Sequence, residues 1–138
     1  MGGTRVKITA DTSVLVRAVV RDDLAQARAA ERALKSATAI AVTLPTLCEF
    51  VRVLRKVYAL ASDEIAIAVR ALLDSRNVVV DRAAAQAGVS VLEAGGDFAD
   101  GVIAHEGERL GGEVFVSFDR TAATMLGNQG HRVRLLHG

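Results

Sequence analysis

Cysteine and aromatic residues are scarce in this sequence, which has no Trp, one Tyr, four Phe and a single Cys. One Cys cannot form an internal disulfide, and this excludes a small secreted scaffold held together by disulfides. Cys48 has no His close to it in sequence and no motif of a cysteine nucleophile, so we interpret it as a buried thiol. The few aromatic rings also argue against a surface that binds nucleic acid mainly by base stacking.

Long hydrophobic runs are also absent. The longest uncharged run covers residues 36–48, which is shorter than the roughly 18 apolar residues that a membrane-spanning helix needs. The first residues, "MGGTRVKI", contain no apolar signal core, so we expect a cytoplasmic protein with no membrane association. No G-x-x-x-x-G-K or G-x-G-x-x-G motif occurs, which argues against a nucleotide-cradling glycine loop.

The length and composition are those of a soluble globular protein. The chain has 138 residues, of which 51% are hydrophobic and 24% are charged. This length suffices to bury one sizeable core. Because no linker, repeat or low-complexity segment is visible, we expect residues 1–138 to form a single domain.

Strand-like and helical patterns alternate along the chain. The expected strands cover residues 5–10, 39–43, 77–81, 113–119 and 131–136. The expected helices cover residues 12–34 with a polar corner at 21–23, then 45–60, 62–73, 82–95 and 97–110, with a short helix between the last two strands. This order predicts an α/β fold with three layers, in which helices flank a central parallel sheet of four or five strands. Ligands of such sheets bind beyond the carboxyl ends of the strands.

Three acids directly follow strand-like runs, namely Asp11, Asp81 and Asp119. Each of them also precedes a helical pattern, and Asp is a favoured helix N-cap, so capping alone can explain any one of them. Asp81 heads a long helical pattern, and we interpret it as a cap. Asp11 and Asp119 remain candidates for a site at the edge of the sheet.

The stretch "GGDFADGVIA" places Asp97 and Asp100 one helical turn apart at the start of a helix. In the structural explanation Asp97 caps this helix, and Asp100 in its first turn complements the helix dipole. That explanation accounts for the pair by itself. It does not account for the other acids that end strands.

Glu49 lies in the helical pattern after the second strand, beside its apolar stripe. An ion pair with Arg52, three residues later, is one explanation and contributes only a few tenths of a kcal/mol. The alternative is that Glu49 reaches toward the same edge of the sheet as Asp11.

If Asp11, Glu49, Asp100 and Asp119 converge, four like charges share a small volume and need a counter-charge. A hard divalent cation is the natural one, and carboxylates suit Mg²⁺ or Mn²⁺ rather than zinc. The net charge is +1 although these four acids are included, so the remainder of the chain is basic. An acidic metal centre on a basic body suits a phosphodiester substrate.

Four segments in order, "ADTSVLVRAV", the Glu in "LPTLCEFVRVLRK", "DFADGVIA" and "VFVSFDRTA", resemble those of PIN-domain ribonucleases. The sequence is most similar to the VapC toxins of bacterial toxin–antitoxin pairs, and the resemblance runs from about Val6 to Leu136. It implies a PIN-like three-layer domain. Each segment is short, so the specificity of the match comes from the order and spacing of all four.

The resemblance also implies a site and an activity. The family's metal-binding acids fall on Asp11, Glu49, Asp100 and Asp119, with Asp97, Ser13 and Ser117 as supporting residues. Three of these acids would hold one or two Mg²⁺ ions, and Glu49 would ligate the metal or orient the attacking water. The expected activity is endonucleolytic hydrolysis of RNA that leaves a 3′-hydroxyl. The expected partners are a second copy of the chain and a cognate antitoxin that inhibits it.

Two positions depart from the family pattern, and two other functions stay open. Gly101 follows Asp100 where the family usually has Ala, and Ser117 stands where Thr is more usual. A non-catalytic RNA-binding or adaptor PIN domain should have lost at least one of the four acids. A receiver-like phosphoacceptor domain should have a pair of acids ending the first strand, but Ala10 precedes Asp11, and it should have a Lys ending the last strand, which is missing here.

Overall fold

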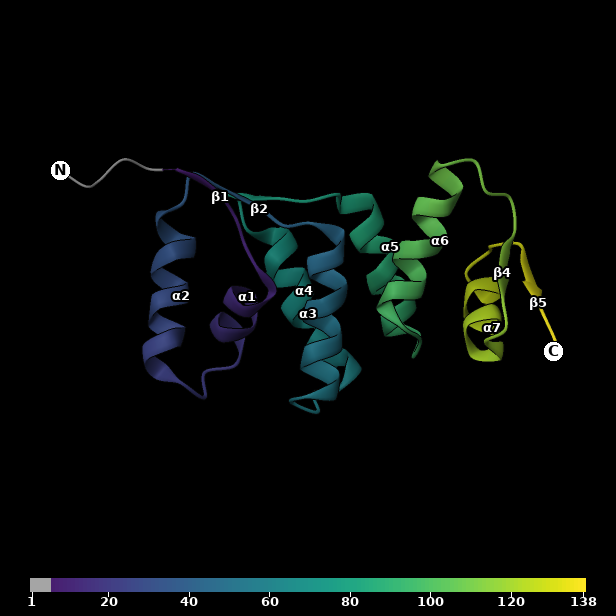
Figure 1. Cartoon of the computed structure of the whole chain (residues 1–138), viewed down its shortest axis with the longest axis horizontal. Helices are drawn as coiled ribbons and strands as arrows, with labels where there is room; N and C mark the ends of the chain where they lie inside the picture. Colours follow the sequence, from purple (N-terminus) through teal and green to yellow (C-terminus); the bar gives the residue numbers. More distant parts are fainter. Residues whose placement is uncertain (1–5) are drawn as a thin grey trace. The chain divides into compact units, whose positions relative to one another are not determined.

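The computed structural model describes residues 6–138 and divides into two compact units, one ending at Asp81 and the other covering Arg82–Gly138 (Figure 1). Arg5, the expected first residue of the first strand, lies outside the described residues.

The N-terminal unit is a small α/β unit with a parallel sheet. Its elements are β1 (Lys7–Thr9), α1 (Thr12–Val19), α2 (Leu24–Ser36), β2 (Ala39–Ala41), α3 (Leu44–Lys56), α4 (Ser62–Asp74) and β3 (Val78–Val79). The strands pair in the order β1-β2-β3, with Ile8 opposite Ile40 and Ile40 opposite Val78. Helix α1 packs against α2 and α3, and α3 packs against α4. Between them lie fully buried side chains, among them Leu15, Leu47, Phe50, Leu54, Ile65 and Val69.

Local signals in the sequence set the helix boundaries of this unit. The polar corner at residues 21–23 ends one helix and starts the next, because the Asp23 side chain accepts a hydrogen bond from the Gln26 backbone N–H (3.1 Å). Helix α3 begins with the Thr43 hydroxyl accepting from the Thr46 N–H (3.3 Å). Pro45 follows in the first turn, where a backbone N–H is not needed.

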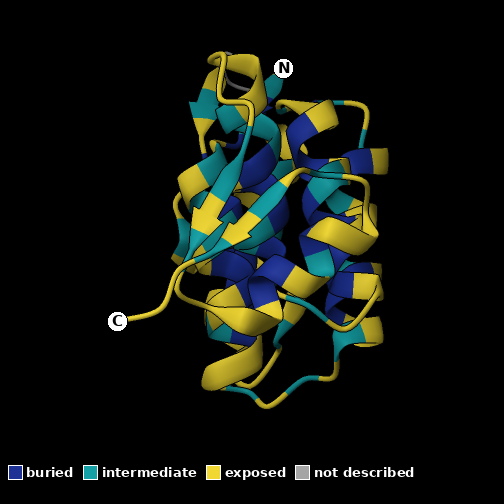
Figure 2. Cartoon of the chain, turned by 90° about the vertical axis from the view of Figure 1, so that its right-hand side faces the viewer, coloured by how far each residue is buried: buried dark blue, intermediate teal, exposed yellow. Residues whose placement is uncertain are grey.

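The C-terminal unit has three helices and two strands. They are α5 (Arg82–Glu93), α6 (Phe98–Arg109), β4 (Phe115–Ser117), α7 (Arg120–Asn128) and β5 (Val133–Leu135). Strands β4 and β5 pair in parallel, with Phe115 opposite Val133. Figure 2 shows these two strands in the colours of half-buried and exposed residues, in agreement with their alternating burial. A small core joins the buried residues Val91, Ala104 and Leu126 to the half-buried Phe115, Met125 and Val133.

Helices α5 and α6 approach so closely that two positions accept only glycine. A Cβ atom at Gly101 would lie 2.4 Å from the Ala87 carbonyl oxygen, and one at Gly88 would lie 2.6 Å from the Phe98 ring. Gly101 therefore replaces the Ala that is usual in the resembled family for a steric reason, and its cost to helix stability is offset by close packing.

The α/β class and all five expected strands are confirmed, and every strand pair is parallel. The strands are shorter than expected, with two or three residues each, and they pair as one sheet of three and one sheet of two instead of a single sheet. The single domain over residues 1–138 stays a prediction, since the chain is described as two units. Within residues 6–138 no helix is long and apolar enough to cross a membrane.

Candidate functional site

Asp11 follows β1 and is the N-cap residue of α1, but its side chain does not cap the helix. The carboxylate makes no hydrogen bond to the backbone of the first turn. Its Oδ2 accepts a hydrogen bond from the Ser13 hydroxyl instead (3.1 Å), and the residue is exposed. The capping explanation is therefore wrong for Asp11, and the supporting role of Ser13 stays a prediction.

Glu49 lies in the second turn of α3, and its side chain is exposed. Its Oε1 accepts a long hydrogen bond from the Thr12 hydroxyl of α1 (3.4 Å). Among the described residues Glu49 forms no ion pair with Arg52, so that alternative is not supported. Asp11 and Glu49 line one open cavity of about 370 Å³, together with Thr12, Ser13, Val16, Arg17, Val53, Val57 and Tyr58.

Two acids of the C-terminal unit do cap helices. The Asp97 carboxylate accepts from the Ala99 N–H (3.0 Å) at the start of α6, and the Asp119 carboxylate accepts from the Ala122 N–H (3.1 Å) at the start of α7. Ser117 supports Asp119, since its hydroxyl accepts a hydrogen bond from the Asp119 N–H (2.9 Å). In both residues the Oδ1 atom accepts the capping hydrogen bond. The Oδ2 atom takes no part in the cap.

Asp100 lies in the first turn of α6 and is half-buried. Burial raises the pKa of its carboxyl above the ordinary value, and the negative charges of Asp97 and Asp119 raise it further. Asp97 and Asp119 are therefore both close enough to repel Asp100. Such crowding of like charges is the situation in which a bound cation stabilises a protein.

The predicted acids are divided between the units, with Asp11 and Glu49 in the first and Asp100 and Asp119 in the second. Over residues 6–138, no group of three or more His, Cys, Asp or Glu side chains is placed so that it could hold a metal ion. The donor chemistry fits Mg²⁺ or Mn²⁺ nevertheless, because carboxylate oxygens supported by hydroxyl groups are the ligands that hard cations prefer.

Sequence reasoning missed three residues near Asp11. Thr12 donates to Glu49, and Arg17 and Tyr58 line the same cavity as the two acids. Arg17 could have been found from its spacing, because Ser13 and Arg17 are four residues apart on α1 and therefore share a face of the helix. Tyr58 follows the end of α3, and no spacing rule assigned it to this cavity.

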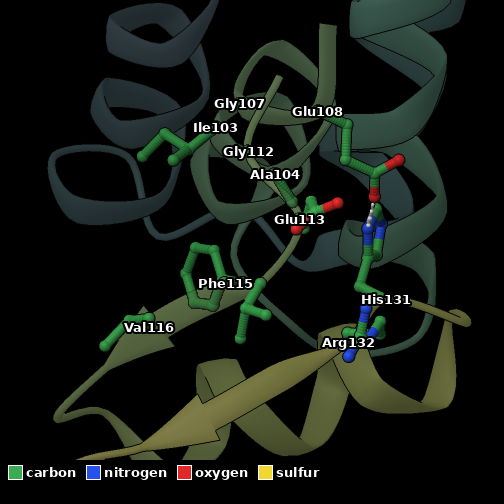
Figure 3. Close-up of a pocket in the computed structure, with 11 residues that line it drawn as sticks. Ile103, Ala104, Gly107, Glu108, Gly112, Glu113, Phe115, Val116, His131 and Arg132 are labelled. Carbon is green, nitrogen blue, oxygen red and sulfur yellow. Dashed lines mark hydrogen bonds and ion pairs between the residues drawn. The ribbon is translucent and has the colours of Figure 1, made fainter. Parts of the chain in front are cut away.

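A second cavity, of about 210 Å³, lies in the C-terminal unit (Figure 3). Its lining includes Ile103, Phe115 and Val116, and an ion pair between Glu108 and His131 closes one side of it. None of the predicted acids lines this cavity. We therefore do not assign it to the same site.

Comparison with known protein families gives a match. A search of curated proteins finds no similar sequence. The model of the PIN domain family matches residues 8–125, a range that includes the four predicted acids and spans both units. PIN domains are in general nucleases, which are hydrolases, and they typically use divalent metal ions. Since the match covers most of the chain, the protein belongs to the PIN domain family.

Proposed function

We propose that the protein is a Mg²⁺-dependent endoribonuclease of the VapC toxin type, which hydrolyses phosphodiester bonds of RNA. The observation that carries this proposal is the environment of Asp11. Its carboxylate is at a helix start without acting as a cap, and with Glu49 it lines an open cavity. Two exposed carboxylates in one cavity are available to a hard cation, for which Mn²⁺ is an alternative.

Asp11, Asp100 and Asp119 would hold the metal, with Glu49 as a further ligand or as the residue that orients water. The four acids form one set in the resemblance to VapC toxins, and the range matched by the PIN family model includes all four positions. The electrostatic repulsion that Asp97 and Asp119 exert on Asp100 supports this assignment. Bound Mg²⁺ would polarise the scissile phosphate and offset the charge that develops on it.

The chain's own residues position the acids and handle the proton. Ser13 holds Asp11, Thr12 holds Glu49, and Ser117 fixes the turn that presents Asp119. Glu49 would orient the attacking water and accept its proton. The water oxygen bonds to phosphorus, the bond from phosphorus to the 3′ oxygen breaks, and that oxygen takes up a proton. The products carry a 5′-phosphate and a 3′-hydroxyl.

Purified protein incubated with mixed cellular RNA tests this proposal. We expect cleavage with Mg²⁺, none with EDTA, and a loss on the order of 100-fold in Asp11→Asn and in Asp100→Asn. Asp74→Asn at the end of α4 is the control, because Asp74 is an exposed acid that lines none of the cavities described above. Cleavage that persists in chelator, or in both site variants, would contradict the proposal. RNA binding without any cleavage would favour the non-catalytic adaptor function instead.

We further propose that the protein forms a homodimer and is inhibited by a cognate antitoxin, and both points rest on the resemblance to VapC toxins. A basic side chain of the antitoxin placed among the acids would supply the counter-charge that these acids need. The test is inhibition of cleavage by a co-purified small partner and by its variants with neutral residues. Inhibition that does not depend on any basic residue of the partner would contradict this mechanism. Light scattering in solution tests the dimer.

A further inference from the structure

We propose that the cavity between α1 and α3 is a subsite for one nucleotide of the RNA substrate, next to the scissile phosphate. In this subsite Arg17 binds a phosphate and Tyr58 stacks against a base. The inference rests on the proposed ribonuclease function and names the residues with which that function selects its substrate. All the residues involved belong to the N-terminal unit.

The cavity extends away from the acids along both helices. On α1, Ser13 and Arg17 are four residues apart, so Arg17 lies one turn beyond the residue that holds Asp11. On α3, Glu49, Val53 and Val57 follow one another at intervals of four residues, which spans about 12 Å along the helix. A groove of this length, with a volume of about 370 Å³, is large enough for a small-molecule ligand.

The lining of the cavity carries both signs of charge. Asp11 and Glu49 contribute carboxylates, and Arg17, about one helical turn beyond Ser13 on α1, contributes a guanidinium. Arg17 forms an ion pair with Asp22 through Nη1 (2.9 Å), and its side chain is 34% exposed. Because a guanidinium has five N–H donors, this ion pair leaves other donors for a phosphate.

Three valines, Val16, Val53 and Val57, also belong to the lining. Val16 is buried and Val57 is 67% exposed. Tyr58, the only tyrosine of the chain, is half-buried beside it. The helix ends here because Ala59 adopts a left-handed conformation (φ 54°) and the Leu60 N–H donates to the Leu54 carbonyl (3.0 Å). This termination fixes the backbone next to Tyr58, which lines the cavity.

A nucleotide matches this arrangement better than a basic peptide segment does. Its phosphate complements Arg17, and its base offers a flat apolar face to Tyr58 and the valines. A cationic peptide would meet favourable charge at the acids but would be repelled by Arg17. The groove therefore favours RNA as its occupant.

Fluorescence offers a direct test, because the chain has one tyrosine and no tryptophan. Emission from tyrosine therefore reports on Tyr58 alone in the full-length wild-type protein. The probe is a trinucleotide of uridine, titrated with Ca²⁺ in place of Mg²⁺, with free tyrosine amide as the control for light absorption by the RNA. We expect saturable quenching by the trinucleotide and weaker quenching by uridine monophosphate.

Variants then separate the two contacts. Tyr58→Leu should raise KM for RNA by about fivefold or more with kcat little changed, while Tyr58→Phe should stay close to wild type. Arg17→Gln should weaken trinucleotide binding severalfold. It should also reduce, by about one, the slope of the logarithm of the binding constant against the logarithm of the salt concentration. Asp22→Asn is the matched control, because it breaks the same ion pair but keeps the cation, and we expect equal or tighter binding.

The outcomes distinguish this inference from the ribonuclease proposal. If RNA is cleaved but Tyr58 fluorescence is unaffected and the Tyr58→Leu variant keeps the wild-type KM, the subsite is wrong and the function stands. If no RNA is cleaved but the trinucleotide quenches Tyr58 and Arg17→Gln weakens binding, the subsite stands and the catalytic function is wrong. If Asp22→Asn weakens binding as much as Arg17→Gln does, Arg17 acts through the fold rather than on phosphate.

Discussion

The two units hold their acids in different ways. In the N-terminal unit Asp11 and Glu49 accept hydrogen bonds from the hydroxyls of Ser13 and Thr12, and neither caps a helix. In the C-terminal unit Asp97 and Asp119 both cap helices through one oxygen. An acid before a helix is therefore no evidence of capping by itself, and each carboxylate has to be judged by the bond that it makes.

The largest expected effect tests whether the acids of the two units act together. We expect Asp11→Asn and Asp119→Asn each to lower the single-turnover cleavage rate on the order of 100-fold, and the double variant to be no slower than the worse single one. Groups that act as one unit are not additive when removed. Asn retains the ability to cap, so the Asp119 variant keeps its helix start. Losses that multiply in the double variant would mean that the two acids act independently.

The second effect concerns the close packing of α5 and α6. Gly101→Ala should lower the free energy of unfolding by about 2 kcal/mol, because the new methyl group would collide with the Ala87 carbonyl. The control is Gly107→Ala in the same helix, where nothing lies within 4 Å of the added Cβ. That variant should gain up to about 1 kcal/mol from helix propensity. Urea denaturation measures both, and equal effects would show that the steric explanation is wrong.

A smaller effect tests the contrast in capping directly. Asp119→Ala should cost about 1 kcal/mol of stability, because it removes a cap that accepts from the Ala122 N–H. Asp11→Ala should cost less than about 0.5 kcal/mol, because it removes no capping bond. Thermal unfolding of the two variants without metal provides the measurement. A larger loss in the Asp11 variant would reverse the comparison.

The smallest effect concerns charge crowding around Asp100. In metal-free protein at neutral pH we expect Asp100→Asn to raise the melting temperature slightly, because a neutral side chain relieves the repulsion from Asp97 and Asp119. The gain should stay below about 1 kcal/mol, since solvent screens partly exposed charges. Added Mg²⁺ should then stabilise the wild type more than the variant. A variant that is less stable than wild type in EDTA would contradict the crowding.

The order of elements could be predicted from the sequence because alternating apolar strands and amphipathic helices have distinct periods. The polar corner at residues 21–23 and Pro45 also gave two helix boundaries correctly. The strand lengths and the pairing into two sheets could not be predicted, because both depend on hydrogen bonds between segments far apart in sequence. Nothing in the local pattern limits β3 to two residues.

The candidate site could be predicted as a set of residue types and positions, but their interactions could not. The sequence places Asp11 and Asp119 in the same context, yet the Asp11 carboxylate bonds to Ser13 and the Asp119 carboxylate caps α7. Which bond forms depends on side-chain rotamers. Tyr58 was overlooked for a related reason, because its place in the cavity depends on how α1 and α3 pack. Gly101 gained its explanation only from the distance to Ala87.

The glycine contact between α5 and α6 has a consequence for how the C-terminal unit opens. Helices that touch through backbone atoms leave little room for water, so their amide protons should exchange with solvent only in the slowest openings of this unit. Strands β4 and β5 are half-exposed and short, and their amides should exchange much earlier. Asp100 belongs to the slow segment and Asp119 follows the fast one. Asp100 and Asp119 therefore belong to segments of the chain that we expect to open at different rates.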